Sequence, residues 1–574
     1  MFQLRVHHAF LILLAVTLTS GCGRRAGDRD ADAWFEDGSR FGILFVHEVE
    51  TSGRHLYSES VGSGAAFVDV DNDGRLDVFL MHNVSPKSGA RNRLFRQRPD
   101  GTFTDASAGS GLETPGYING VAAGDVNNDG LPEILTTEYD RIRLFLNEGG
   151  GKFSDVTERA GLTNRQWSVP AAFFDYDRDG WLDLVVGNYV DFDPSQKCLD
   201  ARGQPDFCGP HGFHSTVTRL FRNLGAAGGR GALPRFQEVT VEAGLAGAPG
   251  KAMQIVCADF DGDHWPDIFI TDDGLPNRLF VNQRNGTFRD EAVARGLAYT
   301  GMGAALANMG VGLGDVNGDG MFDVFVPHLT EEPHTLWVQG PRGIFRDETG
   351  SAGLLDLAAH GTGFGAVLAD FDCDGDNDLA VANGLVRRRR TGAASKPALG
   401  VASFWNPYAE PAQLFANAGA GRFSEVSSAN PALCGASMVG RGLVCGDLDN
   451  DGGLDLLAVG LAGPIRLCRN VASRRGHWLG LRLIDPALGG RDAYGAEVTV
   501  SAGGRRWWRM AQPAYSYASS NDPRVHVGLG QAMQVEAVLV RWPDGAEERF
   551  VITEVDRYLT LRRGSGVFTA SDRR

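Results

Sequence analysis

Short apolar runs recur along the chain, and each pair of runs flanks an acidic loop. Gly64-Ala-Ala-Phe-Val68 precedes the first such loop and Asp77-Val-Phe-Leu-Met81 follows it, and neither run has a helical period. Runs of this length, bounded by Gly and Asp, are typical of buried β-strands. A third strand is expected at Arg93-Leu-Phe-Arg96 and a fourth at Phe103-Thr-Asp105. The pattern therefore predicts a unit of four strands around each acidic loop.

This four-strand unit recurs in seven copies. The third strand has relatives such as Arg143-Leu-Phe-Leu146, and the fourth has relatives such as Phe153-Ser-Asp155. The acidic loops begin 50 to 84 residues apart, a spacing typical of stacked units or propeller blades. We therefore predict an all-β fold in which residues 34–470 form a seven-bladed β-propeller.

The seventh repeat has no fourth strand of its own before the composition changes. Trp34-Phe35-Glu-Asp37 matches the fourth-strand pattern and stands ahead of the first repeat. We expect residues 34–43 to complete the seventh blade, because this closure removes two open sheet edges. The alternative is a strand borrowed from the C-terminal segment, near Trp478 to Leu483.

The C-terminal segment, residues 471–565, alternates apolar and polar side chains, as in Val535-Glu-Ala-Val-Leu-Val-Arg541. This pattern predicts a compact β-sandwich, followed by a tail at 566–574. Its aromatic side chains either belong to the core or form a platform on which sugars stack: Trp507, Trp508, Tyr515 and Tyr517.

The charge balance excludes one class of partner. The 574 residues include 55 basic and 71 acidic side chains, for a net charge of −16. Phosphate binding draws on clustered Lys and Arg, so nucleic acid is excluded. The basic run at 387–390 lies in an insertion of the sixth repeat, and such runs are usually solvated.

The N-terminus resembles a bacterial lipoprotein signal. Arg5 precedes an apolar run from Ala9 to Val16, and Ser20-Gly21 stands directly before Cys22. We expect residues 1–21 to be a signal peptide, Cys22 to carry the lipid and residues 22–33 to be a tether. The protein would then be anchored at the cell envelope, facing the periplasm or the cell surface. The alternative is an ordinary signal peptide with an incidental Cys.

Each acidic loop offers oxygen ligands to a hard cation. Counting the first Asp as position 1, carboxylates or amides stand at positions 1, 3, 5 and 9, and position 6 is Gly in six copies. With a backbone carbonyl at position 7, such a set selects calcium or magnesium over zinc or copper. An EF-hand would need Glu at position 12, where this chain has apolar residues or Thr.

Up to seven Ca²⁺ sites are therefore expected. His264 replaces the position-6 Gly in the fourth loop, which makes that site the weakest candidate. The predicted ligands, loop by loop, are Asp69, Asp71, Asp73 and Asp77; Asp125, Asn127, Asp129 and Glu133; Asp175, Asp177, Asp179 and Asp183; Asp259, Asp261, Asp263 and Asp267; Asp315, Asn317, Asp319 and Asp323; Asp370, Asp372, Asp374 and Asp378; and Asp447, Asp449, Asp451 and Asp455.

The other cysteines divide into two groups. Cys198 and Cys208 lie in one polar stretch and are the best disulfide candidates for an exported protein. Cys257 and Cys445 stand where other repeats have Phe or Leu, so we interpret them as small core residues. The sequence does not pair Cys373, Cys434 and Cys468.

These repeats resemble the FG-GAP (VCBS) repeats of integrin α-subunit propellers. The chain resembles more closely a family of exported proteins related to cartilage acidic protein, in which such repeats precede an ASPIC/UnbV domain. The resemblance implies calcium binding and export. Ala514-Tyr-Ser-Tyr517 departs from the family pattern. The resemblance rests on Phe45-Val-His47, Glu59, Gly62-Ser-Gly64, Gly187-Asn-Tyr189, Met309-Gly-Val311, Arg441-Gly442, Gly495-Ala-Glu-Val498, His526-Val-Gly-Leu-Gly530 and Arg541-Trp-Pro-Asp-Gly545.

Two function classes follow. The first is a protein that binds calcium and acts in binding, adhesion or as a scaffold at the envelope, with a protein or glycan partner. The second is a polysaccharide-directed hydrolase or lyase that uses the mouth of the propeller channel. His47 with Glu59, or His328 with His360, could meet there. No catalytic motif supports the enzyme, so binding is favoured.

Overall fold

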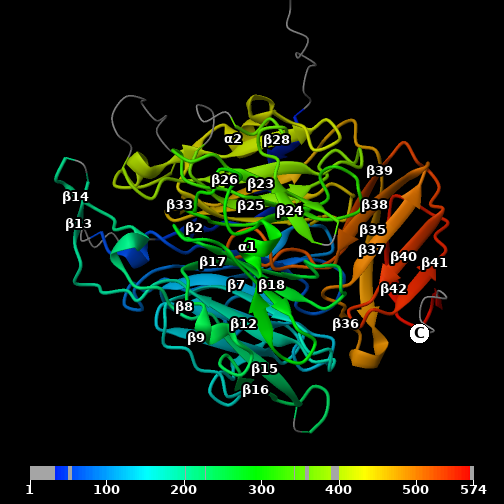
Figure 1. Cartoon of the computed structure of the whole chain (residues 1–574), viewed down its shortest axis with the longest axis horizontal. Coiled ribbons are helices and arrows are strands. Elements are labelled where there is room, and N and C mark those ends of the chain that lie inside the picture. Colours follow the sequence, from blue (N-terminus) through cyan, green and yellow to red (C-terminus); the bar gives the residue numbers. More distant parts are fainter. Residues whose placement is uncertain are drawn as a thin grey trace, which may run out of the picture.

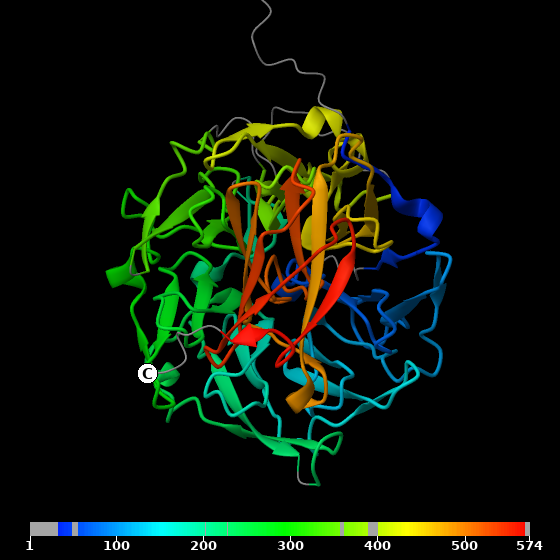
Figure 2. The same ribbon diagram turned by 90° about the vertical axis from the view of Figure 1, so that its right-hand side faces the viewer.

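The computed structural model describes residues 33–48, 55–200, 202–226, 228–341, 343–355, 361–388 and 400–568. These residues form seven four-stranded antiparallel sheets, which follow one another around a ring (Figure 2). Each acidic loop joins the first and second strands of one sheet. From the inner strand outward, the sheets are β3 (Ala65–Val68), β4 (Asp77–Leu80), β5 (Arg93–Gln97) and β6 (Phe103–Asp105); β7 (Ile118–Gly124), β8 (Glu133–Glu138), β9 (Arg141–Asn147) and β10 (Phe153–Asp155); β11 (Ser168–Phe174), β12 (Asp183–Asn188), β15 (Arg219–Ala226) and β16 (Pro234–Glu238); β17 (Ala252–Ala258), β18 (Asp267–Asp272), β19 (Arg278–Asn282) and β20 (Phe288–Asp290); β21 (Gly312–Gly314), β22 (Asp323–Val326), β23 (Thr335–Gly340) and β24 (Ile344–Asp347); β25 (Gly363–Ala369), β26 (Asp378–Asn383), β28 (Gln413–Asn417) and β29 (Phe423–Glu425); and β31 (Gly440–Gly446), β32 (Asp455–Gly460), β34 (Arg466–Asn470) and β1 (Phe35–Asp37).

The all-β fold class is confirmed. Within the described ranges the α-helices are the short α1 (Ala292–Arg295) and α2 (Pro431–Cys434). The inner strands are buried on both faces, because each sheet packs against a neighbour on either side. Phe79 and Phe145, for example, lie in the core between the first two sheets, and both are fully buried. Burial of each such side chain stabilises the fold by roughly 1.5–3 kcal/mol.

The N-terminal strand closes the ring. β1 pairs antiparallel with β34, with Phe35 opposite Asn470 and Asp37 opposite Cys468. Asn430 accepts hydrogen bonds from the backbone nitrogens of Trp34 and Phe35, at 2.7 and 3.3 Å. The sheet of the seventh repeat therefore obtains its fourth strand from the start of the chain and not from the C-terminal segment.

The C-terminal segment forms two sheets that enclose a separate apolar core. Trp507 belongs to this core, whereas Trp508 packs against Phe322 of the propeller with ring centroids 5.4 Å apart. These tryptophans are buried, so they form no sugar platform. The first sheet contains β35 (His477–Asp485), β36 (Arg491–Asp492), β39 (Val525–Gly530) and β42 (Tyr558–Arg562), and the second β37 (Glu497–Ala502), β38 (Arg505–Met510), β40 (Ala537–Arg541), β41 (Glu547–Phe550) and β43 (Val567–Phe568).

The domain extends slightly beyond its predicted end. β43 lies in the segment expected to be a tail, but its residues pair with Glu548 and Arg549 of β41. This two-residue strand pairs with two of the four residues of β41, at the edge of that sheet. The domain lies against one face of the ring, and its strands cross in front of the sheets (Figures 1 and 2).

A segment of the C-terminal domain, residues 512–524, enters the centre of the ring; we call it the plug. Its backbone bonds to the inner strands, as in Phe67 N to Ser520 O at 3.0 Å and Val121 N to Ala518 O at 3.1 Å. Tyr517 is fully buried, and its ring lies 5.1 Å from that of Phe364. The plug therefore fills the channel from this face.

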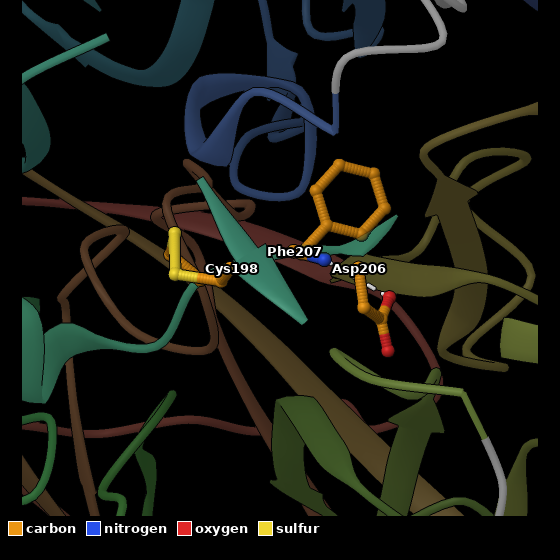
Figure 3. The surroundings of a disulfide bond; sticks show 4 residues. Cys198, Asp206 and Phe207 are labelled. Carbon is orange, nitrogen blue, oxygen red and sulfur yellow. Dashed lines mark hydrogen bonds between the residues drawn. A yellow bond between two sulfur atoms is a disulfide. The ribbon is translucent and has the colours of Figure 1, made fainter. Parts of the chain in front are cut away.

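An insertion of the third repeat covers the opposite face. The hairpin of β13 (Cys198–Leu199) and β14 (Pro205–Asp206) lies far from the C-terminal domain (Figure 1). Cys198 and Cys208 form a disulfide, and the side chains of Asp206 and Phe207 point away from it (Figure 3). Phe207 stacks on Trp405 at 5.4 Å. The hairpin is thus held to the insertion of the sixth repeat.

Several expectations concern residues outside the described ranges. They are the signal peptide at 1–21, the lipidation site at Cys22, nearly all of the tether at 22–33, His360 and the end of the basic run at 389–390. Among the residues that the structure does describe, no helix combines the length and apolar character needed to cross a membrane.

Two further two-stranded pairings complete the described strands. They are β2 (Val46–His47) with β33 (Gly463–Pro464), and β27 (Glu410–Pro411) with β30 (Ser437–Met438).

Candidate metal centres

The seven acidic loops, which we call the Asp loops and number in chain order, share one backbone conformation. The position-1 carboxylate accepts hydrogen bonds from the backbone nitrogens of later loop residues. In loop 1, Asp73 N and Gly74 N donate to Asp69 at 3.0 and 2.8 Å. Positions 4 and 6 are left-handed in all seven loops; in loop 1, Asn72 has φ 56° and Gly74 has φ 85°. The repeated Gly at position 6 suits this geometry.

The position-9 carboxylate connects each loop to the third strand of its sheet. Asp77 accepts from Val70 N at 3.3 Å and from Gln97 N at 2.8 Å, one bond to each oxygen. Glu133 makes the corresponding bonds to Val126 N and Asn147 N, at 2.8 and 3.3 Å. The sequence pattern marks position 9 as a ligand but does not reveal this second, structural role.

The structure gathers carboxylate oxygens in five of the loops. In each, three groups offer oxygens that lie within 4.8 Å of one another. Loops 2 and 5 have Asn127 and Asn317 at position 3, and each amide nitrogen donates to the position-5 carboxylate at 3.0 Å. The five clusters are Asp69, Asp71 and Asp73; Asp175, Asp177 and Asp183; Asp259, Asp261 and Asp263; Asp370, Asp372 and Asp374; and Asp447, Asp449 and Asp455.

Burial makes these carboxylates costly to ionise. It raises the pKa of Asp77 to about 7, of Asp323 to about 8 and of Asp447 to about 7. Burial also raises the pKa of Glu133 well above its ordinary value, and the nearby Asp125 adds to the effect. A bound divalent cation would offset this penalty, because it supplies the missing opposite charge.

The donor set fits a hard cation. All side-chain donors are oxygens, and two of them, Asp175 Oδ1 and Asp449 Oδ1, are buried without a hydrogen-bond partner among the described residues. Buried polar atoms normally have a partner, and a cation at these positions would provide one. The residues present therefore fit calcium or magnesium.

Arginines of the propeller distinguish two groups of loops. Arg222 pairs with Asp177 at 2.6 Å and with Asp179 at 3.2 Å, so it covers two predicted ligands of loop 3. Loops 2, 5 and 6 have no such pair at positions 1, 3, 5 or 9 among the described residues. The corresponding pairs elsewhere are Arg96 with Asp71 and Arg75 with Asp73 in loop 1, Arg295 with Asp261 and Arg284 with Asp263 in loop 4, and Arg469 with Asp449 and Asp451 in loop 7.

Loop 4 departs from the others at His264. This residue has φ 72°, a left-handed conformation that strains a side chain with a Cβ. Its Nδ1 lies 3.4 Å from Asp259 Oδ2. Burial acts to raise the pKa of Asp259, but hydrogen bonds from His264 and Gly262 outweigh it and the pKa is lowered. The imidazole thus lies beside a predicted metal ligand.

The histidines proposed for channel chemistry have structural partners instead. His47 is 2% exposed, and its ring nitrogens lie 2.8 Å from Ser63 Oγ and 2.8 Å from Leu461 O. His328 is fully buried, and its ring contacts Thr335 Oγ1 at 2.9 Å. His82 and His334 lie beside them, with ring centroids 5.4 Å from His47 and 6.5 Å from His328.

The described cysteines outside the disulfide are structural residues of the core. Cys257, Cys373, Cys434, Cys445 and Cys468 are free thiols, and all are buried. Burial raises the pKa of the Cys257 thiol well above its ordinary value, which suits a core residue rather than a nucleophile.

Sequence reasoning missed the residues that connect the Asp loops to the C-terminal domain. Position 4 is Asn in three loops, at Asn72, Asn128 and Asn450. Each accepts a hydrogen bond from an arginine of that domain. Recurrence of Asn at one loop position was the available signal, but the arginines lie 74 to 410 residues away in sequence and carry none.

The fold and the loops define a class: a β-propeller whose repeats carry acidic loops and whose channel is filled by a second β domain. A family model described as FG-GAP-like repeat matches residues 69–136, 125–186 and 259–326, and another, described as ASPIC and UnbV, matches residues 488–567. The chain therefore combines FG-GAP-like repeats with a C-terminal ASPIC and UnbV domain.

Curated relatives agree with this combination. The chain is similar to cartilage acidic protein 1 of Xenopus tropicalis, 26% identical over 521 residues, which is 84% of this chain and 70% of that protein. It is 25% identical to cartilage acidic protein 1 of Mus musculus over 526 residues, with the same coverage of 84% and 70%. The predicted resemblance is confirmed.

Solved structures with a similar arrangement of strands include an Agrocybe aegerita lectin that recognises terminal N-acetylglucosamine. It is 14% identical, with a TM-score of 0.37, over 72% of this chain and 92% of that chain. The β-propeller domain of Myceliophteria thermophila Cps50 is 8% identical, also with a TM-score of 0.37, over 75% of this chain and 100% of that chain. Likenesses of this size carry no inference about function.

Proposed function

We propose that the protein is an exported, lipid-anchored, calcium-binding propeller that acts as a binding, adhesion or scaffold protein at the bacterial cell envelope. The combination of FG-GAP-like repeats with an ASPIC and UnbV domain suggests a binding or adhesion-like role. The observation that carries the calcium proposal is the repeated loop: carboxylate oxygens converge in five clusters, and two of these oxygens are buried without a hydrogen-bond partner among the described residues.

The ion is proposed to bind the carboxylates and amides at positions 1, 3, 5 and 9. These side chains hold the loop around the cation, and the cation neutralises charges that burial makes unfavourable. Loop 6 is the strongest single candidate, because Asp370, Asp372 and Asp374 cluster there and none of them has an ion pair among the described residues.

The partner is proposed to be a protein or a glycan that binds the exposed loops and the rim of the ring. The enzyme alternative gains no support from the channel, since Tyr517 and Phe213 are buried within it. Phe213 stacks on Tyr57 at 5.7 Å on the side of the third-repeat insertion.

Calcium titration tests the proposal directly. Calorimetry on the full chain should show several calcium ions bound, and the melting temperature should rise through about 0.1 to 1 mM calcium, the affinity range of extracellular modules. Magnesium at equal concentration is the matched control for selectivity. Identical melting temperatures in chelator and in excess calcium would refute calcium binding.

A pull-down from the native envelope, with and without chelator, tests the partner. A partner captured in calcium and lost in chelator supports a calcium-dependent binding protein. Capture that is unchanged by chelator would show that the Asp loops do not control recognition.

A further inference from the structure

Three arginines of the C-terminal domain reach the Asp loops at the same loop position. We call Arg482, Arg491 and Arg524 the docking arginines. Arg491 Nη1 lies 3.2 Å from Asn128 Oδ1, and Arg524 Nη1 lies 2.6 Å from Asn450 Oδ1. Arg482 Nη1 donates to Asn72 Oδ1 in the same way. We call the three acceptors the position-4 asparagines.

Each position-4 asparagine also connects its own loop to the next one. The side-chain nitrogen donates to the backbone carbonyl at position 6 of the following loop. The bonds are Asn450 to Gly74 at 3.3 Å, Asn72 to Gly130 at 3.2 Å, and Asn128 to Gly180 at 3.0 Å. Loops 7, 1, 2 and 3 therefore form one hydrogen-bonded series around the ring.

The chemistry of the partners fixes how each amide is turned. An arginine can only donate and a carbonyl can only accept, so the amide oxygen must face the arginine and the amide nitrogen must face the next loop. Loops 4 and 5 have Gly262 and Gly318 at position 4, and glycine can make neither bond. The contact is thus a property of particular loops and not of the repeat in general.

The docking arginines are held in place by their own domain and by burial. Arg482 is fixed by Asp492, at 2.7 and 3.1 Å, and Arg524 by Asp522, at 2.9 Å. Arg491 is 4% exposed and also donates to Gly180 O at 3.1 Å. Because these side chains are already oriented, docking requires the loops to present their asparagines in the matching position.

In loops 1 and 2 the ion and the domain use different atoms of the loop, whereas in loop 7 Arg475 of the C-terminal segment also pairs with the predicted ligand Asp451, at 2.8 Å. The predicted ligands stand at positions 1, 3, 5 and 9, whereas the domain contacts the side chain at position 4 and a carbonyl at position 6. The two sets are joined by the backbone. In loop 7, Asp451 N and Gly452 N donate to the position-1 carboxylate of Asp447 at 3.1 and 2.8 Å. An ion bound at that carboxylate therefore fixes the backbone that orients Asn450.

We propose that cation binding in loops 7, 1 and 2 and docking of the C-terminal domain are coupled through the three pairs of position-4 asparagine and docking arginine. The inference rests on the proposed calcium function and extends it to a regulation within the chain. Two binding events that need the same loop conformation favour each other, and the coupling is reciprocal. Because the plug belongs to the docked domain, calcium also stabilises the plug in the channel.

Hydrogen exchange of the full-length chain tests the coupling. In the wild type, calcium should slow amide exchange in the plug, residues 512–524, by about tenfold or more relative to chelator, a coupling of roughly 1.4 kcal/mol. The test variant carries Asn72→Gly, Asn128→Gly and Asn450→Gly. Glycine suits the left-handed backbone and is the residue that loops 4 and 5 already have.

The triple variant should still bind calcium, measured by calorimetry, because no predicted ligand is changed. Its plug should exchange at the same rate with and without calcium. Asn285→Gly, at an exposed turn of the fourth sheet, is the matched control and should behave as the wild type. Arg491→Lys provides a second test that leaves every loop intact and keeps the positive charge that acts on Asp125: by reciprocity it should weaken calcium binding although Arg491 is no ligand.

The outcomes separate the two proposals. A wild type that binds no calcium refutes the proposed function, and the inference with it. A wild type that binds calcium while exchange in the plug stays unchanged refutes the coupling alone. Equal slowing in the wild type and the triple variant also refutes it, because the asparagines would then carry no coupling.

Discussion

Burial of carboxyl groups at positions 1 and 9 dominates the electrostatics at the residue scale. Burial raises the pKa of Asp77 to about 7 and of Asp323 to about 8, from an ordinary value of 3.8. The folded state without a cation therefore takes up protons that the unfolded state has released. The stability that these protonated carboxyl groups contribute is lost as the pH rises through their folded-state pKa values.

The first prediction is an inverted pH dependence in chelator. The free energy of unfolding should be higher at about pH 7 than at about pH 8.5, by up to roughly 1.4 kcal/mol per pH unit for each carboxyl that takes up a proton. Below about pH 6.5 His47 has the opposite effect: burial lowers its pKa to about 3, so its contribution to the free energy of unfolding rises with pH. Saturating calcium should abolish the difference. Denaturant unfolding at both pH values measures it, and a larger stability at the higher pH in chelator would contradict the argument.

The second prediction concerns the arginines that cover predicted ligands. Arg222→Gln should raise the calcium affinity of loop 3, because a cation no longer has to displace the guanidinium from Asp177, now 2.6 Å away. The pair is partly exposed, so the gain should be no more than about fivefold. Arg219→Gln is the matched control on the same strand, since Arg219 pairs with Glu238 away from the loop. Equal affinities in both variants, by calorimetry, would rule out competition.

At the scale of single elements, β1 matters more than its three residues indicate. It supplies the outer strand of a sheet whose other strands come from the far end of the propeller. Phe35 also packs against Phe371, with ring centroids 5.4 Å apart. The element thus joins the first and last parts of the ring.

The third prediction uses two truncations. Deleting residues 23–43 removes β1 and exposes the edge of β34, so the protein should melt lower and aggregate. Deleting residues 23–32 alone removes no described strand and should leave both properties unchanged. Thermal unfolding and light scattering compare the two. If both truncated chains matched the wild type, the closure would contribute nothing to stability.

At the scale of the whole molecule, the plug makes the propeller and the C-terminal domain one unit. It bonds to several inner strands at once, through Ser520, Ala518 and Ser516. The domain also has a core of its own, while its Tyr494 and Trp508 pack into cores between the sheets. Loss of the plug would therefore weaken the interface without emptying either core.

The fourth prediction is that Tyr517→Ala destabilises the protein by about 3–5 kcal/mol, because it leaves a cavity where a fully buried ring now packs. Tyr299→Ala is the control, since Tyr299 is 39% exposed and should change stability by less than about 1 kcal/mol. Denaturant unfolding measures both. Similar effects for the two tyrosines would show that the channel does not depend on the plug.

The fifth prediction concerns attachment of the molecule to the membrane. Cys22→Ser should release the protein from membranes, because the proposed lipid on Cys22 is the anchor. Fractionation after a high-salt wash measures the release. Continued sedimentation of the variant with membranes would overturn the lipoprotein proposal.

The sequence by itself determined the features that are local. Apolar runs such as Ala65–Val68 and the acidic loop that follows specify two strands and a turn, because strand period and loop conformation depend on neighbouring residues. Repetition then predicted the ring, and the match at Trp34-Phe35 predicted how it closes. The oxygen donors were predicted for the same reason, since all ligands of one site lie within nine consecutive residues.

Only the tertiary structure decided what surrounds those loops. Arg222 beside Asp177, Arg491 beside Asn128 and Tyr517 inside the channel are contacts between residues far apart in the chain. No local period or spacing encodes such contacts, because they arise when sheets and domains pack. For the same physical reason the sequence predicted where a cation could bind. The packed structure decided in which loops a cation competes with an arginine, and which loops contact the C-terminal domain.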